Sequence, residues 1–290
     1  MLNPPVVILP ENAVALLTLL VVGHVFADFG TQTARVAERK GRETAVLVEH
    51  GLVTLVTHLV FVLPLLSVRV AATVLLISIV HTAQDALRAR RFGDTGRELI
   101  VFFADQIAHV VFIIALWSTL VLSGYPIQTL IPTLGAWLPF WTQVAVVGAG
   151  AVFNIRGGSA IVVKMLGQFA GASCGLGGRG AATGRRSPST VLSRARGRAL
   201  YASTKPLGMQ GRGRSRVLSM GQTVGFLERL LVYFLVLNGQ WAALGLVVAA
   251  KAIARFPELK NQDFSDYYLI GTLTSLVVAI ASGMLVLMLV

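Results

Sequence analysis

Charged residues and cysteine are scarce in this chain of 290 residues. Charged residues make up 13% of it, compared with about 25% in an ordinary soluble domain. The single cysteine, Cys174, excludes an intramolecular disulfide framework and cannot by itself form a thiolate metal site. Apolar residues instead reach 55%, and the mean hydropathy is +0.74. This composition predicts an integral membrane protein and argues against a soluble bundle.

Several apolar stretches are about 20 residues long, which is enough to cross a hydrocarbon core of about 30 Å. The stretch from Val217 to Phe256 covers 40 residues, and the turn signal Asn238-Gly239 near its middle divides it into a helical hairpin. The expected spans are residues 11–30, 44–66, 68–87, 98–122, 136–155 with an extension through Gly157-Gly158 towards Leu166, the two hairpin arms, and 266–289. We therefore expect an all-α polytopic membrane bundle of about eight transmembrane helices, within a range of seven to eight.

Lysine and arginine gather on the cytoplasmic side of membrane proteins, so they orient this topology. With eight spans, the basic connections all fall on one side: they hold Arg35 to Arg42, Arg88 to Arg97, the Arg-rich loop, and Lys251 to Lys260. The opposite side has only Arg69 and an uncharged loop from Ser123 to Pro139. Both termini are then expected outside.

Four regions follow from this topology. They are a four-helix half that bears His and Asp (1–122), a fifth membrane helix (123–166), an Arg/Gly-rich cytoplasmic loop (167–216) and a C-terminal membrane half (217–290). The loop carries ten of the twelve net positive charges and no acidic residue. It is expected to be disordered and to lie beside the anionic headgroups of the lipid bilayer. Nucleic acid is disfavoured as a partner, because aromatic interleaving of the basic residues is limited to Tyr201.

All five histidines fall within the first 109 residues, and three of them have an aspartate four positions away. These pairs are His24 with Asp28, His81 with Asp85, and Asp105 with His109, while His50 and His58 lie eight apart on one segment. Residues four or eight apart share one face of an α-helix. At about 1.5 Å of rise per residue, His24, His50, His81 and Asp105 also lie at nearly one depth, about 9 Å from the cytoplasmic ends of their spans. The coincidence of depth on four helices predicts a common site.

Imidazole and carboxylate ligands suit zinc, iron or manganese. The candidate metal ligands are His24, Asp28, His50, His81, Asp85, Asp105 and His109. Asp28, Asp85 and Asp105 are also candidates for catalysis, as general bases for a metal-activated water. Supporting roles around the ligands are expected for Gln32, Glu49, His58, Gln84 and Gln106. Glu228, Arg229, Lys251 and Arg255 are candidates for substrate binding. Structural alternatives remain open, since a single His/Asp pair often only stabilises its helix and basic residues at span ends often anchor it.

Several runs resemble a family of bacterial and phage membrane proteins known as domain of unknown function 3307. The runs are His24 to Gln32, Glu49-His50 with His58, His81 with Asp85, and Phe103 to His109, followed later by Gly225 to Leu231, Gly239-Gln240, Ala250 to Phe256 and Tyr267 to Thr272. The resemblance implies a multi-pass protein of the bacterial cytoplasmic membrane, and it implies no reaction.

The leading hypothesis is a membrane protein with a cytoplasm-facing intramembrane metal site that performs hydrolysis or group transfer on a lipid-linked or phosphorylated substrate. A proton-coupled transporter with His/Asp relays is the main alternative. Haem ligation by two histidines and a non-catalytic scaffold that recruits a partner through the basic loop are the others. No G-x-x-x-x-G-K-S/T loop or H-E-x-x-H motif occurs to favour a common soluble-enzyme chemistry.

Overall fold

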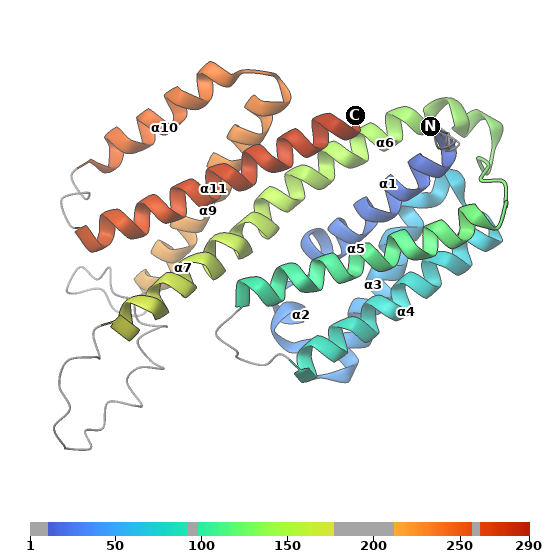
Figure 1. Cartoon of the computed structure of the whole chain (residues 1–290), viewed down its shortest axis with the longest axis horizontal. Coiled ribbons are helices and arrows are strands. Elements are labelled where there is room, and N and C mark those ends of the chain that lie inside the picture. The colour runs from blue at the N-terminus through green and yellow to red at the C-terminus, as the bar shows by residue number, and fades with distance from the viewer. Residues whose placement is uncertain (1–10, 92–97, 177–211, 257–261) are drawn as a thin grey trace, which may run out of the picture. The chain divides into compact units, whose positions relative to one another are not determined.

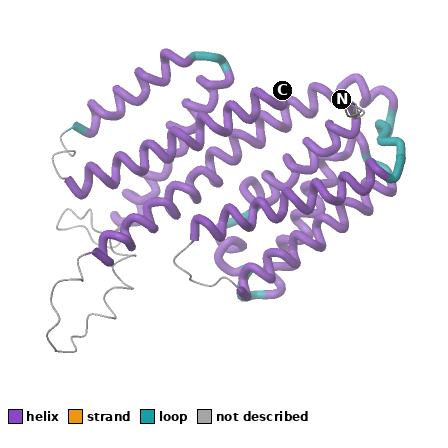
Figure 2. The backbone as a smooth tube through the Cα atoms, viewed as in Figure 1, coloured by secondary structure: helices purple, strands orange, loops and turns teal. Residues whose placement is uncertain are grey.

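A computed structural model describes residues 11–91, 98–176, 212–256 and 262–290, and every regular element in these ranges is a helix (Figures 1 and 2). The chain forms two compact units. The N-terminal unit comprises Met1–Thr95, Ile100–Phe153 and Leu285–Val290, and the C-terminal unit comprises Gly96–Leu99 and Asn154–Met284. The predicted all-α class is confirmed.

The N-terminal unit is built around the helix that begins the described chain. It contains α1 (Glu11–Val25), the π-helical turn η1 (Phe26–Thr31), α2 (Ala34–Arg39), α3 (Thr44–Val62), the 3-10 turn η2 (Leu63–Leu65), α4 (Val68–Arg91), most of α5 (Glu98–Leu122) and α6 (Pro132–Val152). α1 packs against α3 and α6, and the indole of Trp117 on α5 donates a hydrogen bond to the Ala13 carbonyl on α1 at 2.8 Å. α1 therefore lies at the centre of this unit.

The C-terminal unit contains the elements that follow. A second π-helical turn, η3 (Phe153–Gly157), connects α6 to α7 (Gly158–Leu176), and α9 (Arg212–Leu237), α10 (Trp241–Arg255) and α11 (Gln262–Leu289) complete the chain. The turn predicted at Asn238-Gly239 is confirmed: α9 ends one residue before it, and Gly239 has a φ of 65°, a conformation that glycine adopts without strain. Both ends of the predicted loop 167–216 are helical, while its middle, residues 177–211, lies outside the described residues.

Six helices in the described ranges are long and apolar enough to cross a membrane: Glu11–Thr31, Thr44–Leu65, Val68–Arg91, Glu98–Leu122, Pro132–Gln168 and Ser265–Leu289. Trp241–Ala254 is a shorter apolar helix. The chain thus has the architecture of a multi-pass membrane protein, and the fifth span does continue through Gly157-Gly158. The count of eight spans and the placement of the termini stay predictions.

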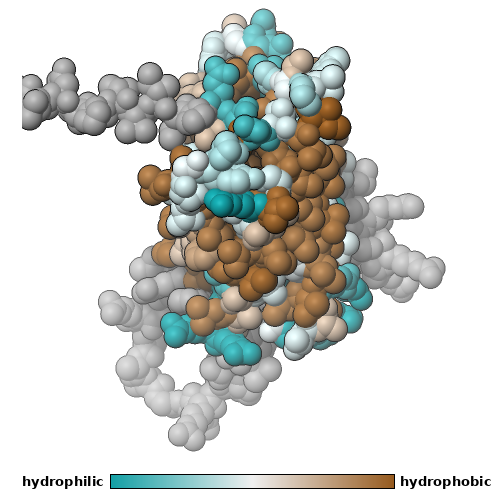
Figure 3. Space-filling model, turned by 90° about the vertical axis from the view of Figure 1, so that its right-hand side faces the viewer, coloured by the Kyte–Doolittle hydropathy of each residue, from teal (hydrophilic) through white to brown (hydrophobic). Residues whose placement is uncertain are grey.

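The distribution of side chains on α3 is that of a helix in lipid. Val48, Leu52, Val56 and Val60, each four residues after the last, are at least half exposed, whereas His50, Thr54 and His58 are buried. Apolar side chains therefore face outward and polar ones inward, the reverse of a surface helix in a water-soluble protein. Figure 3 shows a broad area of apolar side chains on one face of the molecule, with polar side chains at its edges.

Candidate metal centre

Six of the seven predicted metal ligands meet in the N-terminal unit. They are between 1% and 8% exposed and form a buried polar cluster among apolar helices, which we call the His/Asp cluster. Its members are His24 on α1, Asp28 on η1, His50 on α3, His81 and Asp85 on α4, and His109 on α5. They form three overlapping groups, within each of which the ligand atoms lie within 4.8 Å of one another. The cluster could therefore hold a metal ion.

Two imidazoles and one carboxylate form the tightest part of the cluster. Nε2 of His50 lies 3.1 Å from Nε2 of His81, and each nitrogen lies 3.2 Å from Oδ1 of Asp28. Ligand bonds of about 2.0–2.2 Å to a tetrahedral ion place neighbouring ligand atoms about 3.3–3.6 Å apart. The three atoms thus have nearly the spacing that one bound ion requires.

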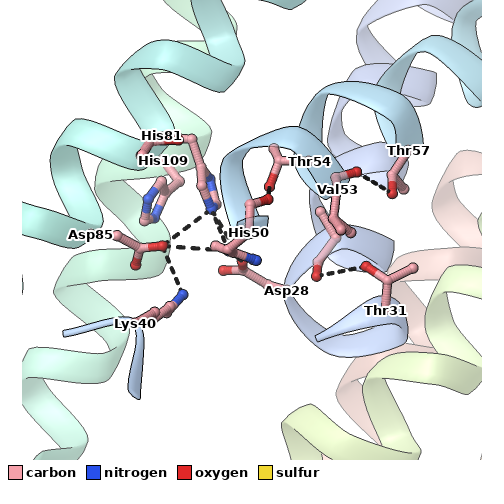
Figure 4. Close-up of polar contacts among 12 residues, drawn as sticks. Asp28, Thr31, Lys40, His50, Val53, Thr54, Thr57, His81, Asp85 and His109 are labelled. Atoms are coloured by element: carbon pink, nitrogen blue, oxygen red, sulfur yellow. Dashed lines mark hydrogen bonds and ion pairs between the residues drawn. The ribbon is translucent and has the colours of Figure 1, made fainter. Parts of the chain in front are cut away.

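A second carboxylate faces the same two nitrogens (Figure 4). Oδ2 of Asp85 lies 3.4 Å from Nε2 of His50 and 3.6 Å from Nε2 of His81. The same oxygen accepts a hydrogen bond from Nζ of Lys40 at 2.7 Å. Asp85 is therefore placed either as a further ligand or as an acceptor that orients the imidazoles, with a buried ammonium group beside it.

Lys40 reaches the cluster because the short helix α2 follows η1. Thr33 caps α2 by accepting a hydrogen bond from the backbone N–H of Val36 at 3.3 Å, and Lys40 lies at the other end of the helix. With the Gln32 amide oriented so that both of its groups find partners, its oxygen accepts from Nζ of Lys40 at 3.1 Å and its nitrogen donates to the Asp28 carbonyl at 2.9 Å. From the sequence, Lys40 served only to orient the topology. No spacing rule connects it to Asp85, so its place in the site was missed.

Two glycines let the helices approach closely at the level of the cluster. A Cβ at Gly23 on α1 would lie 3.0 Å from Cδ2 of His58 on α3, and a Cβ at Gly51 on α3 would lie 2.4 Å from Oγ1 of Thr82 on α4. Gly51 follows His50 directly, and Thr82 follows His81. The missing side chains therefore allow the backbones of α3 and α4 to bring the two imidazoles into contact.

The π-helical turn η1 positions Asp28. π-Helical turns inside α-helices often occur at functional sites. The hydroxyl of Thr31 donates to the Ala27 carbonyl at 3.1 Å and so satisfies one acceptor in this irregular turn. Asp28 presents Oδ1 to the His50–His81 pair, while its Oδ2 accepts a hydrogen bond from Nε2 of Gln106 at 3.1 Å. The two carboxylate oxygens thus face different helices, and Oδ1 has no hydrogen-bond partner among the described residues.

His24 and His109 form the second part of the cluster. Their rings stack with centroids 5.2 Å apart. Nδ1 of His109 lies 2.8 Å from the Asp105 carbonyl, which can only accept, so this nitrogen carries the proton and Nε2 keeps its lone pair. Within the described chain, Nε2 of His109 and both ring nitrogens of His24 have no hydrogen-bond partner.

The carboxylate of Asp105, the seventh predicted ligand, contacts an arginine and lies outside the three groups. Its Oδ1 lies 3.6 Å from Nε of Arg88, and it belongs to none of the three groups. Of the carboxylates predicted to take part in catalysis, Asp28 and Asp85 are in the cluster, whereas Asp105 contributes the backbone carbonyl that fixes the ring of His109.

The five residues predicted to support the metal ligands differ in whether they contact the cluster. Gln106 and Gln32 contact Asp28 as described above. His58 is buried next to Gly23, and its Nδ1 donates to the Thr54 carbonyl at 2.8 Å, but it belongs to none of the three groups. Glu49 forms an exposed ion pair with Arg35, and Gln84 is partly exposed on α4.

The basic substrate-binding candidates belong to the C-terminal unit. Lys251 on α10 forms an ion pair with Glu228 on α9, and its Nζ lies 5.6 Å from the ring centroid of Tyr268. The side chain of Arg255 lies outside the described residues. A small, partly open pocket is lined by Glu228, Arg229, Val232, Val247, Val248, Lys251, Thr272, Ser275 and Leu276.

Arg229 is 4% exposed and is held by neutral acceptors. Its Nε donates to the Asn154 carbonyl in η3 at 2.7 Å, and its two terminal nitrogens donate to the hydroxyls of Ser275, at 3.4 Å, and Ser159. A Cβ at Gly158 would lie 2.9 Å from Nε, so glycine makes room for the guanidinium. These contacts tie α9 to η3, and a role for the four residues in substrate binding stays a prediction.

The comparisons agree with the resemblance described above. Residues 16–136 match the model of a family described as protein of unknown function (DUF3307). This match confirms the resemblance and spans all six residues of the His/Asp cluster. The later runs of the resemblance, from Gly225 to Thr272, lie outside the matched range. No curated protein and no solved structure matches the chain. The description of this family names no activity. The His/Asp cluster is therefore the feature of the chain that indicates a function.

Proposed function

We propose that the chain is a membrane metalloprotein whose His/Asp cluster binds a divalent ion through Asp28, His50 and His81. The observation that carries this proposal is the triangle of Nε2, Nε2 and Oδ1 atoms, with sides of 3.1, 3.2 and 3.2 Å, buried on three helices. Nitrogen and oxygen donors of this kind suit zinc, iron or manganese. Asp85 completes the ligand set or orients the two imidazoles.

The charges of the cluster support a cation. With the imidazoles neutral, Asp28 and Asp85 contribute two negative charges and Lys40 one positive charge, which leaves one negative charge in a buried setting. Buried charge is costly unless it is compensated. A divalent ion would over-compensate by one unit, and an anionic ligand or substrate group on the ion would restore neutrality.

We propose hydrolysis or group transfer on a lipid-linked or phosphorylated substrate as the reaction. Held by Asp28, His50 and His81, a divalent ion would supply Lewis-acid chemistry and would activate a water near neutral pH. In this proposal the carboxylate of Asp85, which forms an ion pair with Lys40, would accept the proton released by the attacking water. The ammonium group of Lys40 would attract the anionic part of the substrate. Because the cluster is buried, substrate entry requires helix motion at its cytoplasmic end, where η1 and α2 lie.

Metal analysis of the purified, detergent-solubilised full chain tests the proposal. The wild type is expected to retain at least one zinc, iron or manganese ion per chain, and the double variant His50→Ala/His81→Ala is expected to retain one ion fewer per chain than the wild type. His58→Gln is the matched control, because His58 is buried on the same helix as His50 but belongs to none of the three groups. A wild type that stays metal-free after reloading would rule the proposal out.

The second candidate function is a proton-coupled transporter. It is favoured by the chain of contacts from Lys40 through Asp85 to His50, His81 and Asp28, since one proton on an imidazole would also neutralise the cluster. Proteoliposomes with a pH-sensitive dye separate the two. Transport would be favoured if the chelator-stripped wild type conducts protons and the His81→Gln variant does not.

A further inference from the structure

The His/Asp cluster contains more ligands than one ion can use. A catalytic tetrahedral ion takes three protein ligands and a water, and the His50–His81 pair with Asp28 already supplies the three. His24 and His109 remain. Neither shares a group with His50, although His109 also forms a group with His81 and Asp85, and its ring centroid lies 4.2 Å from that of His81. Instead they form a group of their own with Asp28, whose ligand atoms lie within 4.8 Å of one another.

His24 and His109 are poorly explained as packing residues. Both are 2% exposed, yet within the residues that the structure covers three of their four ring nitrogens lack a hydrogen-bond partner. Buried polar atoms are nearly always paired in native proteins, and exceptions call for an explanation such as a missing ion. Because His109 carries its proton on Nδ1, the lone pair of Nε2 is free to bind a metal ion. Metal-ligating histidines show this arrangement when their other nitrogen donates to a carbonyl.

We infer that the cluster binds two divalent ions bridged by the carboxylate of Asp28. One ion takes His50 and His81, next to which Asp85 lies, and the second takes His24 and His109. Asp28 is shared by the groups that contain the two pairs, and its two oxygens face different neighbours, with Oδ1 towards His50 and His81 and Oδ2 towards the amide of Gln106. The inference rests on the proposed function for the first ion and adds the second.

A two-ion centre would define the substrate class more narrowly. Pairs of ions about 3.5–4 Å apart clamp the attacking and leaving oxygens of an in-line displacement at phosphorus. In the cluster, the second ion would also supply the positive charge that attracts a phosphate group. A phosphate ester or diphosphate is therefore the substrate class that fits this centre.

The test counts ions. The full chain in detergent is stripped with a chelator, reloaded with Mn²⁺, and its metal content is measured per chain. The wild type is expected to bind two ions, and His24→Ala and His50→Ala one each, while His58→Gln keeps two. Electron paramagnetic resonance of the Mn²⁺-loaded wild type is expected to show an exchange-coupled pair, and both single variants an isolated ion.

The outcomes separate the two proposals. One ion in the wild type, unchanged in His24→Ala and without exchange coupling, overturns the two-ion centre and leaves the single metal site intact. No ion in the wild type overturns both. If His24→Ala fails to fold, His109→Gln replaces it, and the count and spectrum of the wild type decide by themselves.

Discussion

Gly51→Ala tests whether the close approach of α3 and α4 creates the metal site. The new Cβ would lie 2.4 Å from Oγ1 of Thr82, about 1 Å closer than the 3.4 Å at which ordinary contact begins. The helices are expected to separate by about that distance next to His50 and His81, because the β-branched side chain of Thr82 is stiff and its hydroxyl is held by a 2.7 Å hydrogen bond to the Ser78 carbonyl. Over-packing of this kind typically destabilises a protein by about 1–3 kcal/mol.

The metal site is expected to suffer more than the fold. A shift of about 1 Å exceeds the tolerance of about 0.5 Å within which functional side chains must be held. We therefore expect the affinity for Zn²⁺ to fall by about 10–100-fold, as when an outer contact of a metal ligand is lost. Competition with a chromogenic chelator measures the affinity, and thermal unfolding of the metal-free protein measures the loss of stability.

The double variant Gly51→Ala/Thr82→Ala provides the matched rescue. Without Oγ1, the nearest atom to the new Cβ is Cβ at position 82, at 3.5 Å, which is ordinary contact. Most of the lost affinity should then return. Gly245→Ala, where a Cβ meets nothing within 4 Å, should leave binding unchanged. Wild-type affinity in Gly51→Ala, or a double variant no better than the single one, would refute the reasoning.

Three further predictions concern Lys40, Arg229 and residues 177–211. Lys40→Met leaves Asp85 without its cation, so the metal-free protein should lose about 3–5 kcal/mol while Zn²⁺ binds more tightly; equal destabilisation with and without metal in thermal unfolding would contradict this. Arg229→Leu removes the donors to the Asn154 carbonyl and should lower the melting temperature, yet metal content by elemental analysis should stay at the wild-type value. Deletion of residues 177–211 should weaken flotation with anionic vesicles and leave metal content unchanged, whereas loss of metal would point to a role for the loop in the site.

Helix positions could be predicted because they follow from apolar length and turn chemistry. The stretches expected at 44–66 and 98–122 appear as Thr44–Leu65 and Glu98–Leu122, and the hairpin turns at Gly239. The bounds of α6 differ, since the helix begins at Pro132 rather than 136. Proline is well tolerated in the first turn of a helix. Pro132 therefore indicates where α6 begins, whereas hydropathy alone placed the beginning of this helix at residue 136.

The convergence of His24, His50 and His81 could be predicted from depth, because residues at one level on neighbouring helices need only the right rotation to meet. Rotation is what the sequence leaves open. Asp105 and His109 are four residues apart, which is a displacement of about 40° around the helix at 3.6 residues per turn. Helix packing orients α5 so that the ring of His109 lies in the cluster, whereas the carboxylate of Asp105 lies next to Arg88.

Lys40 and the π-helical turn could not be predicted for a different reason. Lys40 contacts Asp85 only because α2 folds back after η1, and that path depends on tertiary contacts such as the hydrogen bonds of Gln32. The close approaches at Gly23 and Gly51 are likewise properties of helix pairs, and no pattern within one helix reports them.

X-ray absorption spectroscopy of the zinc-loaded full chain tests the metal centre most directly. The His/Asp cluster predicts a shell of nitrogen and oxygen ligands at about 2.0–2.2 Å, with outer-shell scattering from imidazole rings that falls in His50→Ala/His81→Ala. A shell without imidazole scattering, a sulfur ligand at about 2.3 Å from Cys174, or a spectrum that the double variant leaves unchanged would contradict a metal centre at these residues.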